Sequence, residues 1–581
     1  MTYNPPSEEQ VFALRVSAGI DELAQSNRFA AATPDMIEAI VEGIGAFAAG
    51  EWAPLNRAGD TQGAKLVDGK VELPEGFAKA YQDYVEQGWN SVSGPEEFGG
   101  QGLPFCLGIC VLENLGAANL ALSLNPMLTV GAIEALEHHG SEEQQAKYLH
   151  KLVSGEWTGT MNLTEPQAGS DVGALRTTAT PITEGEHAGK YRIAGQKIYI
   201  TWGEHEFTEN IIHLVLARVP DAPAGSRGIS LFIVPKNHVN EDGSIGARND
   251  VRCVSLEHKL GINASPTCVM SYGDDGECIG ELVGRENEGL RAMFTMMNNA
   301  RINVGAQGVE IGERAMQQAM HYANERVQSA RAGGADKNPI SIVDHPDVRR
   351  MLLRMRALVE GGRALLYYNC GQVDRGTLGD PAAQARADLL VPMTKAWCTD
   401  RGIEVASLAL QVHGGMGFVE ETGAAQFYRD ARIAPIYEGT NGIQAADLVT
   451  RKLGMEGGGV LASLMDEIAG DAGEEAPGLA SLAKDCREIG EWMAGEASLD
   501  DRLGGSVPFL EMCAVAVAGW QLLRQSRAVQ AGEASGKVAL SKPVIARYFL
   551  EHIVPEAGGL RSAVLGGSDL LYELPADALT G

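Results

Sequence analysis

Apolar residues change their spacing twice along the chain, and this change predicts helices, then strands, then helices again. Before residue 160, apolar positions recur every three or four residues in three segments, at 34–49, 77–87 and 126–138. Four later segments are short, rich in β-branched and aromatic residues and separated by turns, at 191–201, 210–219, 228–236 and 250–256. Helical spacing returns in five segments, at 290–327, 346–373, 381–413, 506–531 and 542–554.

These elements predict an α+β protein of several domains, in agreement with a length of 581 residues. Consecutive strands without helices between them favour an antiparallel β-barrel or sandwich. Stretches rich in glycine and acidic residues, at 454–460 and 469–478, predict a hinge or linker. We therefore expect an N-terminal helical extension, an N-terminal helical domain, a β domain, a C-terminal helical bundle and an appended helical domain, at 1–34, 35–158, 159–282, 283–454 and 455–581.

An excess of acidic side chains limits the partners of this protein. The formal net charge is −29, from 47 basic and 76 acidic residues. Such a surface repels nucleic-acid phosphates and anionic lipids, so we expect neither nucleic acid nor a membrane as a partner. A small anionic ligand is still compatible, because it needs only a local cluster of donors. The nine cysteines form no CxxC pair, which predicts reduced core thiols and no metal site.

The N-terminal residues MTYNPPSEEQ contain no basic region followed by an apolar one, so they do not resemble a signal peptide. The longest apolar run, 512–523, is too short to span a bilayer. We therefore expect a cytoplasmic protein without membrane insertion.

Four segments are unusually rich in glycine and polar residues, at 161–179, 196–204, 411–418 and 432–444. Taken singly, they are compatible with a surface loop, a plain strand, a helix C-cap and a solvated glutamate. The functional alternatives are a ligand-binding loop, a wall of Tyr199, Thr201 and Trp202, a glycine-lined cofactor contact, and a general base at Glu438. Neither a GxGxxG after a strand nor a GxxxxGK[ST] or GxSxG is present, which argues against nucleotide-binding loops and hydrolase elbows.

Taken together and in this order, the four segments resemble the acyl-CoA dehydrogenase family, and the resemblance covers residues 35–453. TEPQAGSD is similar to the family's flavin loop, and GQKIYIT is similar to its strand against the flavin. QVHGGMGF resembles its cofactor-binding turn, and IYEGTNGIQ resembles the segment that holds the catalytic glutamate. The order of helices, strands and helices agrees with the family's fold.

The resemblance implies an FAD-dependent α,β-dehydrogenation of an acyl-CoA thioester. Glu438 would remove the α-proton while a hydride leaves the β-carbon for the flavin. The main-chain N–H of Glu438 and a ribityl hydroxyl of the flavin would polarise the thioester carbonyl. Some members carry the base on a helix beside an arginine, but here that neighbour is Ala300, so Glu438 keeps the role.

The resemblance also assigns binding residues position by position. Contacts with the flavin or the thioester are expected from Met161, Leu163, Thr164, Gly169, Ser170, Tyr199, Thr201 and Thr440. The residues expected to reach the flavin of a neighbouring subunit are Arg326, Gln411 and Gly415. Residues on the substrate side are Ser170, Asn298, Arg301 and Gly439. The family's CoA-binding arginine falls on Thr450, so that contact is left unassigned.

The two chain extensions, 1–34 and 455–581, resemble the bacterial branch of the family that converts 3-(methylthio)propanoyl-CoA to 3-(methylthio)acryloyl-CoA in dimethylsulfoniopropionate breakdown. The alternatives are a medium- or long-chain fatty acyl-CoA dehydrogenase, an acyl-CoA oxidase, and a non-catalytic flavin-binding relative. The resemblance further implies an electron-transfer flavoprotein as electron acceptor. We expect a homodimer, because the appended domain would replace a second dimer interface.

Overall fold

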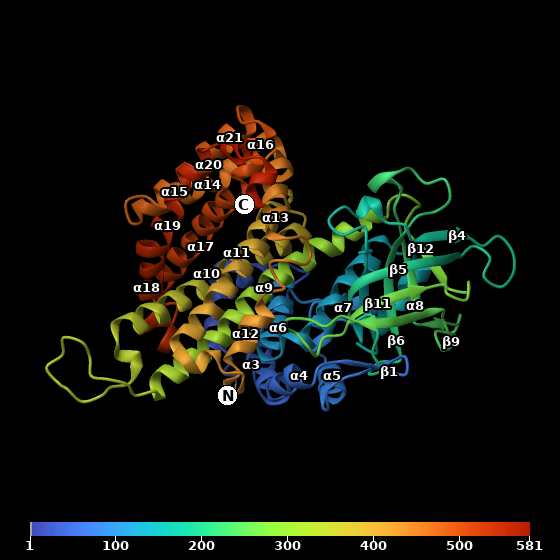
Figure 1. Ribbon diagram of the computed structural model, residues 1–581, viewed down its shortest axis with the longest axis horizontal. Coiled ribbons are helices and arrows are strands. Elements are labelled where there is room, and N and C mark those ends of the chain that lie inside the picture. Colours follow the sequence, from blue (N-terminus) through green and yellow to red (C-terminus); the bar gives the residue numbers. More distant parts are fainter. Residues whose placement is uncertain (1–2, 581) are drawn as a thin grey trace.

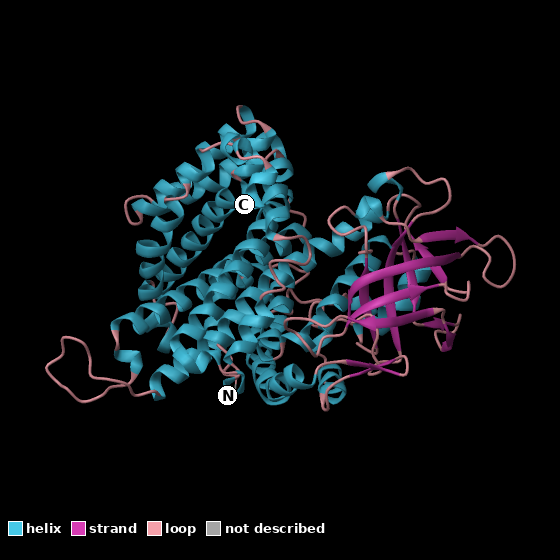
Figure 2. Ribbon diagram, in the orientation of Figure 1, coloured by secondary structure: helices cyan, strands magenta, loops and turns pink. Residues whose placement is uncertain are grey.

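The computed structural model describes residues 3–580. Helices form most of the molecule, and one large sheet lies at one end of its long axis (Figure 2). The helices that precede the sheet are α3 (Pro34–Phe47), α4 (Asn56–Gln62), α5 (Phe77–Glu86), α6 (Phe105–Ala118), α7 (Leu120–His139) and α8 (Glu142–Val153). Helix α7 begins before its predicted start, so that Pro126 lies inside it.

The sheet contains eight strands: β3 (Trp157–Asn162), β4 (Thr178–Pro181), β5 (Tyr191–Thr201), β6 (Asn210–Ala217), β7 (Ser230–Pro235), β10 (Val251–Leu256), β11 (Thr267–Tyr272) and β12 (Ile279–Val283). The strand order is β10-β11-β5-β12-β7-β6-β3, and β4 pairs with β5. Two short hairpins, β1–β2 (65–67 and 70–72) and β8–β9 (237–239 and 245–248), lie outside it.

The pairing differs from a purely antiparallel sheet at one place. Strands β3 and β6 run parallel, with Trp157 opposite Asn210, because the chain makes a long crossover through β4 and β5 between them. Within residues 3–580 the two end strands, β10 and β3, do not pair, so the sheet is mixed and open. Strands β3, β6 and β7 are buried along their whole length. This agrees with the largely apolar sequences of β6 and β7, whereas β3 buries two threonines and an asparagine.

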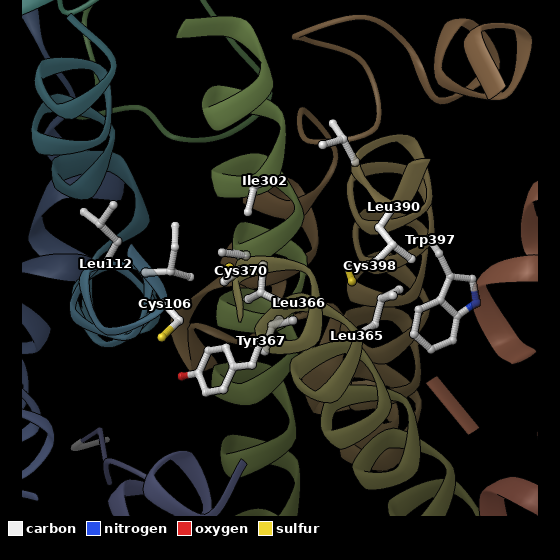
Figure 3. Packing of buried hydrophobic residues seen from close by; sticks show 14 of the residues in the cluster. Cys106, Leu112, Ile302, Leu365, Leu366, Tyr367, Cys370, Leu390, Trp397 and Cys398 are labelled. Carbon is white, nitrogen blue, oxygen red and sulfur yellow. The ribbon is translucent and has the colours of Figure 1, made fainter. Parts of the chain in front are cut away.

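Three long helices after the sheet form the central bundle, α9 (Gly289–Glu325), α10 (Pro346–Thr377) and α11 (Pro381–His413). The shorter helices α12 (Ala424–Ala431) and α13 (Asn441–Asp447) follow. Figure 3 shows the bundle core, where Ile302 of α9, Leu366 of α10 and Leu390 of α11 point into one apolar cluster. All nine cysteines are buried and free, as the sequence predicted.

The last domain consists of α14 (Gly459–Ala472), α15 (Pro477–Gly495), α16 (Leu499–Gly504), α17 (Ser506–Gln530), α18 (Gly536–Tyr548), α19 (Val554–Gly558), α20 (Arg561–Leu565) and α21 (Asp569–Glu573). The predicted hinge or linker is only partly present. Helix α14 lies mainly between the two glycine- and acid-rich stretches and takes in only 459–460 of the first and 469–472 of the second. Its apolar face is buried through Leu461 and Leu464, while Asp466 pairs with Arg487 at 2.6 Å. The chain therefore forms an amphipathic helix between two short irregular segments.

Helix α17 is long and apolar enough to cross a membrane, judged by length and composition alone. However, 83% of its most apolar window is buried inside the protein. It packs against α10, α11, α15 and α18, as Figure 1 shows. These contacts are those of the core helix of a globular domain.

A buried ion cluster joins the N-terminal extension to the last domain. Lys542 of α18 is fully buried, and its Nζ lies 2.6 Å from Glu9 Oε1 and 2.6 Å from Glu360 Oε2. Glu9 belongs to α1 (Ser7–Ala13) and Glu360 to α10. One cation thus links three parts of the chain that are far apart in sequence.

We expect Lys542→Met to lower the free energy of unfolding by about 3 kcal/mol, because Glu9 and Glu360 would stay buried and lose the cation that they share. Arg356, 2.6 Å from Glu360, and Arg363, 4.0 Å from Glu9, would remain as partial compensation. Guanidinium denaturation followed by circular dichroism measures the change. The control is Arg487→Met, whose ion pair with Asp466 is exposed to solvent and should contribute much less to stability. Equal effects of the two variants would contradict the role of Lys542.

Candidate active site

Glu438 lies on a tight turn between α12 and α13. Its φ is 55° and that of Gly439 is 82°, so two successive residues adopt the left-handed conformation. The carbonyl of Glu438 accepts a hydrogen bond from Gln444 Nε2 at 3.1 Å, and the carbonyl of Gly439 accepts one from Lys395 Nζ at 2.8 Å. Within residues 3–580 the N–H groups of Glu438 and Gly439 donate no hydrogen bond. Two donors beside the carboxylate are therefore available to a ligand oxygen.

The Glu438 carboxylate is partly buried between two cations. Burial raises its pKa, and the nearby charges of Arg301 and Lys395 oppose that rise. Arg301 lies on α9, is buried, and leaves its Nε without a partner among the described residues. Asn298 lies one turn earlier on the same helix and is half-buried. The structure thus places Arg301 near Glu438 and Gly439.

Thr440 ends the turn and starts α13. Its Oγ1 accepts a hydrogen bond from the N–H of Ile443 at 3.2 Å, and the residue is exposed. Thr440 is therefore the N-cap of α13, and it is exposed to solvent two residues after Glu438.

Tyr199 projects from the end of β5 at a β-bulge. The register with β11 shifts by one residue there, Tyr199 has a φ of 59°, and 60% of its surface is exposed. Thr201 is half-buried, and its carbonyl accepts a hydrogen bond from Thr160 Oγ1 at 2.7 Å. Trp202 is completely buried and donates to the carbonyl of Ala121, so it does not line the predicted aromatic wall.

The loop that follows β3 lies against β5. Met161 is buried on β3, whereas Leu163 and Thr164 are half-buried. The carbonyl of Leu163 accepts from Lys197 Nζ at 3.1 Å, and the carbonyl of Thr164 accepts from the N–H of Ile198 at 2.9 Å. Further along, the residues at the exposed tip of this loop are Gly169 and Ser170.

Sequence reasoning missed the side chain that fixes this loop, Glu165. Its Oε1 accepts from Lys197 Nζ at 2.8 Å and from Thr177 Oγ1 at 2.6 Å. Its Oε2 accepts from the N–H of Arg176 at 2.6 Å. Burial tends to raise the pKa of Glu165, but Lys197 and these donors lower it to about 2. The sequence signal was its position inside the TEPQAGSD segment.

Arg326, Gln411 and Gly415 lie elsewhere in the molecule. Arg326 is an exposed residue at the C-terminus of α9, and its Nη2 donates to Gln328 Oε1 at 3.0 Å. Gln411 and Gly415 are exposed at the end of α11. This end lies close to Arg326, as shown by the stacking of the rings of Tyr322 and His413, whose centroids are 4.5 Å apart. Figure 1 shows the loop after α9 at the end of the long axis opposite the sheet.

Three of the predicted glycines face open space. A Cβ built on Gly169, Gly414 or Gly415 would meet no atom within 4 Å. Only Gly414, with a φ of 60°, needs glycine for its own backbone. The absence of a side chain at the other two positions leaves room for a group from outside the chain.

Sequence profiles of four domains match almost the whole chain. They are the acyl-CoA dehydrogenase N-terminal domain over 34–156, the middle domain over 160–274, the C-terminal domain over 287–453, and an acetyl-CoA dehydrogenase C-terminal-like domain over 460–575. The chain belongs to the acyl-CoA dehydrogenase family. Membership confirms the predicted class of enzyme, an acyl-CoA dehydrogenase with FAD as cofactor.

Relatives of full length within this acyl-CoA dehydrogenase family are known. The chain is 46% identical to 3-methylmercaptopropionyl-CoA dehydrogenase of Ruegeria pomeroyi, over 98% of this chain and 99% of the relative. It is 32% identical to a broad-specificity linear acyl-CoA dehydrogenase of Mycobacterium tuberculosis, over 97% of each chain. An acyl-CoA dehydrogenase of Bacillus anthracis, solved in complex with FAD, shares the fold with a TM-score of 0.74 and 20% identity, over 94% of this chain and 90% of that one.

The residues of this acyl-CoA dehydrogenase fit the flavin. The open space at Gly169 and the exposed ring of Tyr199 are compatible with a flavin against this face of the sheet. Unused N–H groups at Glu438 and Gly439 supply donors on the same side as the base.

We expect Glu165→Gln to destabilise the protein by about 3–5 kcal/mol, because Lys197 would stay buried without its counter-charge. The folded pKa of about 2 is below the ordinary value of 4.5. The stabilisation is therefore fully present above pH 4.5 and is lost as the pH falls towards 2. Urea denaturation of both proteins between pH 7 and pH 3 should show the difference shrinking with acid; a constant difference would contradict it.

Proposed function

We propose that Glu438 is the general base that removes the α-proton of the acyl-CoA in this enzyme. The observation that carries the proposal is the turn itself. It combines a partly buried carboxylate of raised pKa with two unused N–H groups on a backbone held by Lys395 and Gln444. A carboxylate of raised pKa is a stronger base, and N–H donors beside it stabilise charge on a thioester oxygen.

The chain's own residues divide the work as follows. The N–H of Glu438 donates to the thioester carbonyl oxygen, which makes the α-proton more acidic. The Glu438 carboxylate accepts that proton. FAD, when bound, supplies the acceptor for the hydride that leaves the β-carbon, so that the Cα–Cβ bond becomes a double bond. Arg301, which belongs to α9, lies near Glu438, and its positive charge favours the ionised form of the Glu438 carboxylate before the reaction.

The same-chain part of the flavin site is proposed on the face of the sheet that presents Tyr199. Its members are Met161, Leu163, Thr164, Gly169, Ser170, Tyr199, Thr201 and Thr440. We propose Ser170, Asn298, Arg301 and Gly439 for contacts with the substrate. The exposure of Tyr199 and the open space at Gly169 support this arrangement.

The substrate is proposed to be 3-(methylthio)propanoyl-CoA, with 3-(methylthio)acryloyl-CoA as product. The support is the identity of 46% over both whole chains with the enzyme of Ruegeria pomeroyi named for that acyl group. The alternative is a linear fatty acyl-CoA, supported by the broad-specificity relative at 32%. A thioether is nearly the size of a methylene, so saturated acyl-CoAs of similar length should react as well.

We further propose a cytoplasmic homodimer that passes its electrons to an electron-transfer flavoprotein, with the five domain boundaries expected above. The position of Arg326 supports the dimer. It follows Arg301 on α9 by 25 residues, which corresponds to ~38 Å along a helix. One flavin pocket cannot use both residues of the same chain over that distance, so Arg326, Gln411 and Gly415 are proposed to serve a second copy.

We expect Glu438→Gln to bind FAD normally and to lose flavin reduction, because the amide cannot accept the α-proton. Anaerobic titration with 3-(methylthio)propanoyl-CoA, followed by bleaching of the flavin, measures it. The wild-type rate should fall in acid at a pH above the ordinary glutamate pKa of 4.5, as burial of the base requires. Wild-type bleaching by Glu438→Gln would overturn the assignment.

The same titration with butanoyl-, octanoyl- and palmitoyl-CoA tests the substrate. Fastest bleaching by the thioether substrate and by butanoyl-CoA is the expected result. If only the long-chain acyl-CoAs reduce the flavin, the assignment of Glu438 as the base would stand and the proposed substrate would be contradicted. Hydrogen peroxide formed in step with turnover in air would favour the oxidase instead.

We expect Arg326→Ala to retain FAD about 10-fold less tightly, because a charge-assisted bond to phosphate would be lost. Arg331→Ala, in the same exposed loop, is the control and should retain flavin fully. Light scattering should give the mass of two chains for the wild type. A mass of four chains, or full flavin retention by Arg326→Ala, would contradict this arrangement.

A further inference from the structure

Lys395 of α11 has a role in the site that the sequence motifs do not cover. We propose that it is a positioning residue, whose ammonium group holds the catalytic turn in place and keeps the Glu438 carboxylate ionised. This inference rests on the proposed role of Glu438 as the base.

The contacts of Lys395 point at the catalytic turn. Its Nζ donates to the carbonyl of Gly439 at 2.8 Å and to Asn441 Oδ1 at 2.9 Å. One bond therefore fixes the peptide that follows Gly439, and the other fixes the first residue of α13. With the bond from Gln444 to the carbonyl of Glu438, both carbonyls of the left-handed turn are held towards the protein interior. The two N–H groups of the turn are not used in these contacts.

Asn441 connects this lysine to the backbone of α11. Its Nδ2 donates to the carbonyl of Ala396 at 3.0 Å, to Thr399 Oγ1 at 3.0 Å and to Asp400 Oδ1 at 2.8 Å. The turn is thus attached to one side of a long core helix. A turn held at this many points keeps Glu438 in one geometry when the substrate enters.

The charge of Lys395 is unusual among the buried lysines. Lys197 and Lys542 are also fully buried, and each contacts a carboxylate, at 2.8 Å and 2.6 Å respectively. Lys395 is fully buried too, yet within residues 3–580 no carboxylate lies within 4.0 Å of its Nζ. Its two acceptors, Gly439 and Asn441, are neutral. Such a cation is costly to bury, and a need for its charge explains why it is there.

The groups that face Lys395 decide its protonation. The pKa of Lys395 is lowered to about 7, mainly by burial. The carboxylates of Glu438 and Asp400 oppose this lowering, and the charge of Arg301 adds to it. Other charges around this cluster are Asp447, Arg451, Arg401 and Arg432. Below pH 7 Lys395 carries its proton and favours the carboxylate form of Glu438. Once Glu438 has accepted the α-proton, its negative charge no longer holds that cation.

Two variants separate charge from geometry. Lys395→Gln keeps a hydrogen-bond donor without the charge, and Lys395→Met removes both. The matched control is Asn441→Ala, which loosens the same turn and leaves the ammonium in place. Each protein is purified with its flavin, and the rate of flavin bleaching by 3-(methylthio)propanoyl-CoA is followed from pH 5 to pH 9. Flavin content and thermal midpoint report whether each variant has folded.

We expect Lys395→Met to be about 10- to 100-fold slower, since a misplaced base costs this much. In both lysine variants the acid limb should move up by about one pH unit, because Glu438 loses a nearby positive charge. Asn441→Ala should be slower with an unshifted limb. If Lys395→Met does not retain flavin, Lys395→Gln alone decides.

An unshifted acid limb in Lys395→Gln would overturn the electrostatic role, and a wild-type rate and profile in both lysine variants would overturn the inference entirely. The proposed function fails in a different way, namely if Glu438→Gln bleaches as fast as the wild type. The two failures are therefore distinguishable in one series of titrations.

Discussion

The left-handed turn at Glu438 and Gly439 is the constraint on which the rest of the site depends. A non-glycine residue with positive φ costs about 1–3 kcal/mol and persists only where its surroundings determine it. Lys395 and Gln444 supply these surroundings by binding the two carbonyls of the turn. In return the turn leaves two N–H groups free beside a carboxylate, an arrangement that the interior of a regular helix cannot offer because its N–H groups are used internally.

Buried cations connect distant parts of this chain at several places, and their environments differ with their roles. Arg363 of α10 contacts Glu113 of α6 at 2.8 Å and Glu313 of α9 at 2.9 Å, which fastens the N-terminal helices to the bundle. Lys197 fastens the predicted flavin loop to β5 through Glu165. These cations are neutralised by carboxylates, and their contribution is structural. Lys395, by contrast, contacts the neutral oxygens of Gly439 and Asn441.

The bounds of an element could be predicted from the sequence where a single periodicity of apolar residues extended over many residues. Helix α11 has the predicted bounds, because Asp380 and Pro381 mark its start and Gly414 its end, and strand β5 also has the predicted bounds. The sequence was insufficient where partners lie far apart, as with the parallel pairing of β3 and β6 and the contact of Lys395 with Gly439. The linker expected at 454–460 and 469–478 was only partly right, because helix α14 forms between the two stretches. The family motifs located Glu438, and only the fold shows what holds it.

The length of α9 separates the functions of its two ends. Near its start, Arg301 faces Glu438, and at its C-terminus Arg326 lies beside the end of α11. A straight helix keeps these ends ~38 Å apart whatever the rest of the chain does. The glycines at 414 and 415 face open space at the distant end, where this chain offers no partner within 4 Å. This end of the helix therefore leaves room for the close approach of a second copy, as proposed for Arg326, Gln411 and Gly415.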